Sequence, residues 1–131
     1  MHGAKNFPSK KMKSSLDINL PDKCEDTMYL SLLHDNLYKS LEICKNNWGK
    51  YPDIVFYLAG VDIVVGDKLG RVSVTRNGLK RREKMVLEFC EEIDVPIVLL
   101  TAGGYQKTSE LTAELHAEVF REAFRMFNKK K

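Results

Sequence analysis

DIVFYLAGVDIVVGD, residues 53–67, is the stretch that decides the fold of this chain. It contains an apolar run from Ile54 to Val61 in which polar residues do not alternate with apolar ones. Such a run is typical of a strand buried on both faces, as in a parallel sheet, and predicts a strand over residues 53–59. A carboxylate, Asp62, follows at once. This acid is either an ordinary loop or capping residue or a metal ligand at the end of a buried strand.

A second apolar run lies further along the chain, at residues 96–101, and predicts another buried strand. Between the two strands we expect a helix over residues 76–93, capped by Thr75. Apolar residues spaced three and four apart predict two more helices, over residues 26–46 and after a cap at Thr108 or Ser109. The predicted inner faces of the three helices, in chain order, are Leu30, Leu33, Leu37, Leu41 and Cys44, then Leu79, Val86, Cys90 and Ile93, and then Leu111, Leu115, Val119, Ala123 and Phe127.

The predicted order is helix, strand, helix, strand, helix, preceded by an irregular segment over residues 1–25. Alternation of helices with buried strands indicates an α/β fold with a parallel sheet. Sites in such sheets lie in the crevice outside the carboxyl ends of the strands. Asp62 follows one strand end, and Gly103-Gly104-Tyr105 follows the other.

Asp62 and Tyr105 each have a plain interpretation beside a chemical one. A catalytic zinc needs about three protein ligands. The histidines His34 and His116 fall within predicted helices, away from any strand end, where surface exposure or partial packing is the commoner role. Tyr105 follows two glycines that allow a sharp turn and close approach of a ligand. Its phenol either packs over that turn or donates a hydrogen bond to a developing oxyanion. No phosphate-binding glycine motif is present.

Composition indicates one soluble domain without a nucleic-acid or membrane partner. The chain has 131 residues, 44% hydrophobic and 30% charged, and a net charge of +3. Seven of its 21 basic residues are lysines at the two ends, which leaves 14 against 18 acids in the body. The odd cysteine count argues against a disulfide framework, and the longest apolar run is too short to span a bilayer. Without a signal peptide, we expect a cytoplasmic protein.

Four motifs in this order carry a family resemblance: HGAKNFP (2–8), SSLDINLPD (14–22), AGVDIVVGDKLGRVSVT (59–75) and TAGGYQK (101–107). Together they resemble the C-terminal part of the zinc-dependent histone deacetylase family, in particular its class IV and bacterial deacetylase-like branch. The resemblance covers all but the lysine tail at 129–131. It implies the C-terminal half of the arginase/deacetylase-type fold, a partial doubly wound parallel sheet, and a truncated deacetylase-like domain over residues 1–128.

The resemblance also implies roles for five residues. Family members hydrolyse the amide of acetyl-lysine or of related acylated amines. By motif matching, Asp62 resembles one of three zinc ligands, and Tyr105 resembles the donor to the substrate carbonyl and its oxyanion. Phe7 resembles an aromatic wall of the acyl-lysine channel, Leu69 an apolar wall near its mouth, and Gly103 a residue whose backbone lines it.

The rest of the family's catalytic set is absent from this sequence. The resemblance places two further zinc ligands in a D-x-H motif and the general base in a His-His pair, both before Met1, and the chain contains neither motif. We therefore expect weak or no zinc binding and no deacetylation by the isolated chain. The alternatives are one piece of a split two-chain deacetylase, which would act on acyl-amines when complemented by an N-terminal half, and a non-catalytic remnant or interaction module. A truncated sheet leaves an open edge and face, so we expect self-association or a partner chain.

Overall fold

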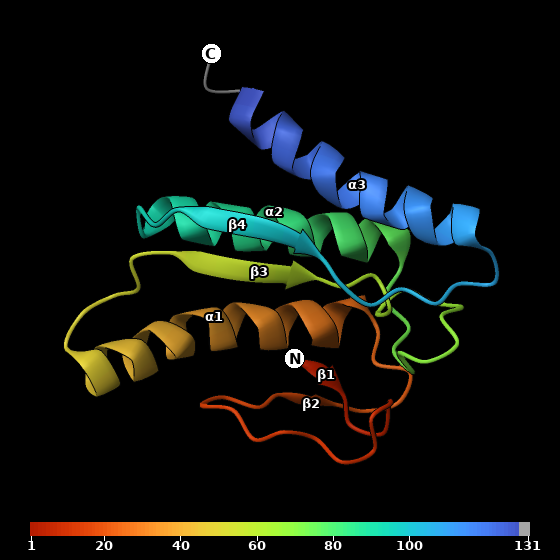
Figure 1. The fold of residues 1–131 in the computed structure, drawn as a ribbon, viewed down its shortest axis with the longest axis horizontal. Helices are drawn as coiled ribbons and strands as arrows, with labels where there is room; N and C mark the ends of the chain where they lie inside the picture. Colours follow the sequence, from red (N-terminus) through yellow and green to blue (C-terminus); the bar gives the residue numbers. More distant parts are fainter. Residues whose placement is uncertain (129–131) are drawn as a thin grey trace.

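Two parallel strands form the sheet that positions the strand ends. The computed structural model describes residues 1–128. Within them, β3 (Val55–Ala59) pairs with β4 (Ile97–Thr101) along their full lengths, from Val55 opposite Ile97 to Ala59 opposite Thr101. Helix α2 (Arg76–Glu92) connects them (Figure 1). The predicted parallel α/β unit is confirmed, and because the pairing is parallel and in register, both strands end at the same edge.

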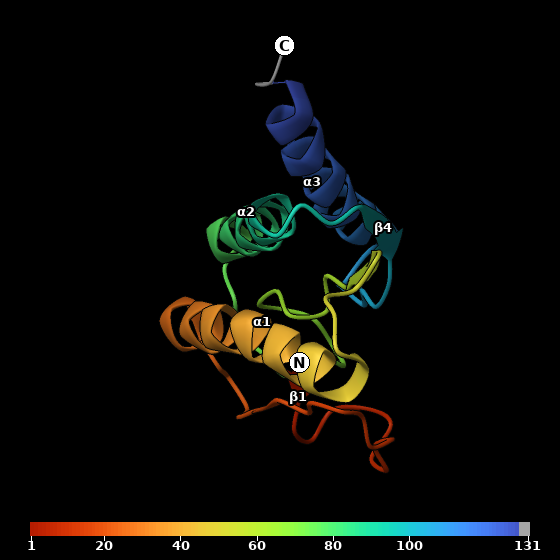
Figure 2. The same cartoon turned by 90° about the vertical axis from the view of Figure 1, so that its left-hand side faces the viewer.

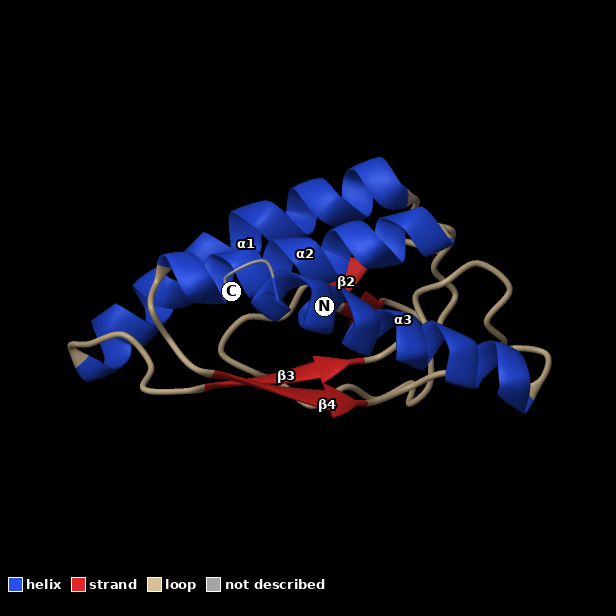
Figure 3. Ribbon diagram, turned by 90° about the horizontal axis from the view of Figure 1, so that it is seen from above, coloured by secondary structure: helices blue, strands red, loops and turns tan. Residues whose placement is uncertain are grey.

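Helices cover one face of this sheet. Helix α1 (Asp26–Trp48) and helix α2 lie on the same side of β3 and β4 (Figures 2 and 3). Tyr57 and Ala59 point toward that core, whereas Phe56 and Leu58 are 62% and 65% exposed. The prediction of burial on both faces is therefore wrong for the described chain, because no described helix covers the second face.

The core lies between α1, α2 and β3 and continues beneath the loop that follows β3. Leu20, Val74 and Leu79 are fully buried in it, together with Val61 from that loop. Burying a leucine such as Leu79 contributes about 1.5–3 kcal/mol. The apolar residues that follow β3 therefore anchor the loop that carries Asp62.

Side-chain caps join the starts of α1 and α2. The Thr75 hydroxyl accepts a hydrogen bond from the Gly78 amide (3.0 Å), as predicted for an N-cap. It also donates to the Asp26 carboxylate (2.6 Å), which accepts a second bond from the Thr75 amide (2.7 Å). At the other end of α1, Gly49 takes the left-handed conformation, φ 72°, as expected for the residue that closes a helix.

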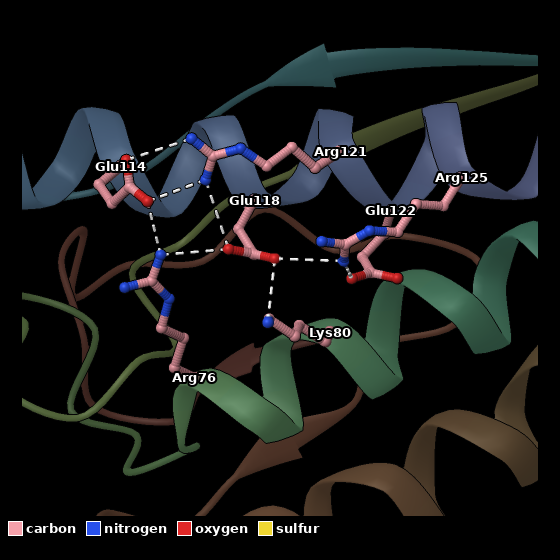
Figure 4. A network of polar contacts seen from close by, with 7 residues as sticks. All are labelled: Arg76, Lys80, Glu114, Glu118, Arg121, Glu122 and Arg125. Atoms are coloured by element: carbon pink, nitrogen blue, oxygen red, sulfur yellow. Dashed lines mark hydrogen bonds and ion pairs between the residues drawn. The ribbon is translucent and has the colours of Figure 1, made fainter.

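Helix α3 (Ser109–Asn128) packs across α2 through an ionic network (Figure 4). Its predicted inner stripe is confirmed at Leu115 and Val119 but is wrong at its ends, since Leu111 and Phe127 are half exposed. Glu118 is buried instead, which an amphipathic pattern does not predict. The cations that surround its carboxylate come from α2 and α3, at N–O distances of 3.1–3.6 Å: Arg76, Lys80, Arg121 and Arg125.

The N-terminal segment is more ordered than predicted. β1 (His2–Gly3) and β2 (Asn19–Leu20) form a short parallel pair. The segment lies against the loop after β3, because the Lys23 amide donates to the Arg71 carbonyl (2.8 Å). The predicted lysine tail at 129–131 lies outside the described residues. Among residues 1–128, no helix combines the length and apolarity needed to cross a membrane.

Candidate functional site

The loops after β3 and β4 are joined by backbone hydrogen bonds. The Gly103 carbonyl accepts from the Val61 amide (2.6 Å) and from the Asp62 amide (3.2 Å). This follows from the parallel pairing, since the strand ends deliver the two loops to the same place. Asp62 and the glycine pair before Tyr105, which the sequence places at separate strand ends, therefore form one site.

Glycines enclose Asp62 on three sides. A Cβ added to Gly60 would lie 2.8 Å from Asp62 Oδ1, and one added to Gly103 would lie 2.8 Å from Oδ2. A Cβ on Gly70 would fall 1.6 Å from the Asp62 carbonyl oxygen, closer than any non-bonded contact allows. The carboxylate therefore occupies a slot that the absence of side chains on Gly60 and Gly103 creates, and this slot fixes its position.

The carboxylate of Asp62 is half-buried, and its surroundings disfavour its charge. Burial raises the pKa of Asp62, and the nearby Asp67 raises it further, whereas Arg82 and His116 act in the opposite direction. A bound cation would relieve the unfavourable desolvation and the repulsion between the two acids. The slot thus has the charge and geometry expected of a cation ligand.

Asp67 ties the Tyr105 loop to the Asp62 loop, and sequence reasoning missed it. One carboxylate oxygen accepts from the amides of Leu69 and Gly70, both at 2.8 Å. The other accepts from the Tyr105 amide at 2.6 Å, and the Lys68 amide donates to the Tyr105 carbonyl at 3.1 Å. The tyrosine backbone is therefore held on both sides, while its ring is 47% exposed. The only sequence signal was an acid directly after Gly66.

His116 lies closer to the site than its helical position suggested. A Cβ added to Gly104 would meet His116 Nε2 at 3.1 Å, so the imidazole lies behind the glycine pair. Burial lowers the pKa of His116, Arg82 lowers it further, and Asp62 opposes both. The prediction that His116 lies away from any strand end is wrong, because α3 folds back over the loop that precedes it. His34 is exposed beside Asp35, as expected of a surface histidine.

The other predicted substrate-site residues are placed as follows. Gly103 forms one wall of the Asp62 slot. Leu69 lies in the turn that Asp67 caps and is 41% exposed. Phe7 lies on the loop between β1 and β2, with its ring 79% exposed. Their roles in a substrate channel remain predictions.

A metal at Asp62 would need further ligands. In the part of the chain that the structure describes, no three His, Cys, Asp or Glu side chains gather in a metal-binding group. A catalytic zinc takes about three protein ligands. Asp62 fits one of these positions, and residues 1–128 do not gather a full set of three around it.

Comparison with known proteins gives the site its context. A family model described as the histone deacetylase domain matches residues 2–122. The chain belongs to the histone deacetylase family. The predicted resemblance is thereby confirmed, and it covers nearly all of the described chain.

The relatives that match this histone deacetylase family chain are much longer than it is. An uncharacterized protein of Picosynechococcus sp. is 44% identical over 107 residues, which are 82% of this chain and 34% of the relative. Histone deacetylase 2 of Arabidopsis thaliana is 40% identical over 73 residues, covering 56% of this chain and 18% of the relative. The chain thus spans about a third or less of these relatives.

A solved structure supports the same fold. The crystal structure of an acetylpolyamine aminohydrolase from Burkholderia pseudomallei aligns with a TM-score of 0.62 at 20% identity. The alignment covers 83% of this chain and 28% of that one. The predicted fold class, part of the arginase/deacetylase-type α/β fold, is confirmed.

Proposed function

We propose that this chain supplies part of the active site of a zinc-dependent deacetylase that acts on acetyl-lysine or a related acyl-amine. The observation that carries the proposal is the Asp62 slot, where a desolvated carboxylate lies between Gly60 and Gly103 at the edge that also carries Tyr105. Family membership supplies the reaction class, hydrolysis of an amide.

Asp62 and Tyr105 have complementary tasks in this proposal. A Zn²⁺ ion bound here would supply Lewis-acid polarisation of the scissile carbonyl and of an attacking water. Asp62 would hold that ion with a carboxylate that lies in the space left by the missing side chains of Gly60 and Gly103. Tyr105 donates its phenolic proton in a hydrogen bond to the carbonyl oxygen as negative charge develops there. Asp67 fixes the backbone from which that phenol projects.

The chain does not itself provide a general base in this scheme. Water activation needs a group of suitable pKa near the substrate. His116 lies beside Gly104 but does not line the groove that reaches Asp62, and His34 is exposed on α1. We therefore infer that a second polypeptide segment supplies the base and the remaining metal ligands, and that the chain alone does not turn over.

The exposed apolar surface supports such a partner. Phe56 and Leu58 on β3 and Leu100 on β4 form an open sheet face, each more than 40% exposed. A groove of about 520 Å³ runs beside β3, walled by α1 and by Leu16 of the N-terminal segment, and it reaches Asp62. Exposed apolar surfaces of this kind mark interaction sites. We propose that an N-terminal half of the same domain type covers them.

Two measurements test the proposal. Zinc content and hydrolysis of an acetyl-lysine peptide are first measured for the isolated chain, with and without added Zn²⁺, and we expect neither stoichiometric zinc nor turnover. The region of the Picosynechococcus relative that precedes the matched segment is then added as a separate polypeptide, and we expect zinc and turnover to appear together.

An interaction module without catalysis is the second candidate, favoured by the same open sheet face. It predicts that the chain binds a partner or another copy through Phe56 and Leu58 without any gain of activity. Phe56→Lys would then abolish association in analytical ultracentrifugation. Association that persists in this variant would rule out the open face as the contact surface.

A further inference from the structure

A buried ion pair on α2, Arg82 with Glu83, has no role in the site described so far. Arg82 is 4% exposed and Glu83 is 1% exposed. Taking two charges out of water is costly, and a hydrophobic pair of similar size often stabilises a fold as well or better. The pair therefore calls for a reason beyond stability.

The guanidinium of Arg82 is held from two sides. Its Nε donates to Glu83 Oε1 at 2.9 Å, and Nη2 also donates to that oxygen. The second Glu83 oxygen accepts from the Tyr57 hydroxyl at 2.8 Å, and the guanidinium lies 5.7 Å from the centre of the Tyr57 ring. Because Tyr57 belongs to β3, the pair is fixed to the strand whose end carries Asp62.

Another nitrogen of Arg82 reaches the site itself. Arg82 Nη1 donates to the Gly60 carbonyl at 2.6 Å. Gly60 forms one wall of the Asp62 slot, since a Cβ there would lie 2.8 Å from Asp62 Oδ1. Gly60 has no side chain to pack, so hydrogen bonds hold it: its amide donates to the Leu58 carbonyl (3.0 Å), and its carbonyl accepts from Arg82. The position of this wall therefore depends on α2.

Charge compensation makes the arrangement compatible with a metal. An unpaired guanidinium close to Asp62 would repel a cation bound there. Glu83 pairs with Arg82 and offsets part of its charge, so the repulsion that a cation at the slot would feel from the guanidinium is reduced. An uncharged donor at this place would lack the forked geometry that contacts Glu83 and Gly60 simultaneously.

We propose that Arg82 is a positioning residue for Asp62: through the Gly60 carbonyl it helps to set the slot that orients the carboxylate toward a divalent cation, and Glu83 holds Arg82 in place and offsets part of its charge. The inference rests on the proposed function of Asp62 as a metal ligand. Removing a group that orients a ligand typically weakens metal affinity about 10- to 100-fold.

The test uses the full isolated chain, isotope-labelled, with Co²⁺ at up to millimolar concentration as the probe. Paramagnetic effects on the amide signals of Val61, Asp62 and Gly103 give the affinity at this site, separately from surface acids. Arg82→Met/Glu83→Leu removes both charges together, so no unpaired charge remains buried, and Arg82→Lys keeps the cation but loses the fork. We expect at least about ten-fold weaker Co²⁺ affinity in both variants.

Two control variants distinguish a wrong proposal about Asp62 from a wrong proposal about Arg82. Arg121→Met changes an ion pair on α3 that does not touch the slot, and we expect wild-type Co²⁺ affinity whatever its melting temperature. Asp62→Asn must remove the paramagnetic effects at these amides. If it does not, the proposed ligand role is wrong. If it does, but the folded Arg82 variants bind Co²⁺ as tightly as wild type, the pair is only structural and the inference on Arg82 is overturned.

Discussion

Gly103→Ala is the substitution that probes the Asp62 slot most sharply. The new Cβ would lie 2.8 Å from Asp62 Oδ2 and 3.0 Å from its Cγ. Ordinary van der Waals contact begins at 3.4 Å, so the carboxylate oxygen must retreat by about 0.6 Å. Metal–ligand distances tolerate shifts of only about 0.2 Å. The substitution therefore displaces the ligand by more than a metal site accepts.

We expect Gly103→Ala to lower the stability of the fold only slightly and to weaken metal binding at Asp62 strongly. Rotating the Asp62 side chain away from its preferred rotamer costs about 1 kcal/mol. For a chain of this size, that corresponds to a fall in melting temperature of roughly 4 °C. We expect the affinity of the slot for Co²⁺ to fall at least about ten-fold at the same time.

Gly49→Ala is the matched control for this experiment. Gly49 has φ 72° and no atom within 4 Å of an added Cβ, so the substitution strains only the end of α1. A left-handed alanine costs about 1–2 kcal/mol, which is comparable to the expected cost of Gly103→Ala. Calorimetry and the Co²⁺ titration are run on both variants. Equal Co²⁺ affinity in the two would refute the reasoning about the slot.

Three further predictions concern catalysis, capping and pH. In a complemented enzyme, Tyr105→Phe should lower kcat about 100-fold with zinc content unchanged; a parallel loss of zinc would contradict a donor role. Thr75→Ala should lower the free energy of unfolding by about 1 kcal/mol in urea titrations, with Thr75→Ser near wild type, and equal losses in both would argue against the cap. Burial alone would raise the pKa of Glu118, but Lys80 and Arg76 outweigh it and hold the pKa below its ordinary value. The ionised Glu118 carboxylate therefore stabilises the fold fully above about pH 4.5, and this contribution is lost as the pH falls through the folded-state pKa. The free energy of unfolding, measured between pH 3 and 7, should fall with decreasing pH in wild type and should fall less in Glu118→Gln. Identical pH profiles for the two would contradict the stabilising role of the Glu118 carboxylate.

The main elements could be predicted because their signals are local. The apolar runs before Asp62 and before Gly103 are long enough to indicate strands, and alternation with helices indicates parallel pairing. Parallel pairing then brings both strand ends to one edge, so the proximity of the Asp62 and Tyr105 loops follows from the sequence. The cap at Thr75 was predictable for the same reason, since a cap acts within a few residues.

The supporting residues could not be predicted because their partners lie far along the chain. Asp67 contacts Tyr105 across 38 residues, and Arg82 contacts Gly60 across 22. Charged residues on helices are ordinarily exposed, so a pattern gives no reason to bury Arg82 or Glu118. Glu118 becomes buried only because α3 crosses α2 at a point where cations from both helices surround it.

The most direct test of the central claim is the zinc content of the chain mixed with the preceding region of the Picosynechococcus relative, compared between wild type and Asp62→Asn. We expect about one zinc per complex with the wild-type chain, together with hydrolysis of an acetyl-lysine peptide. With Asp62→Asn we expect both to be lost, although the two polypeptides still associate. Equal zinc content in the two complexes, or turnover by the isolated chain, would contradict this claim.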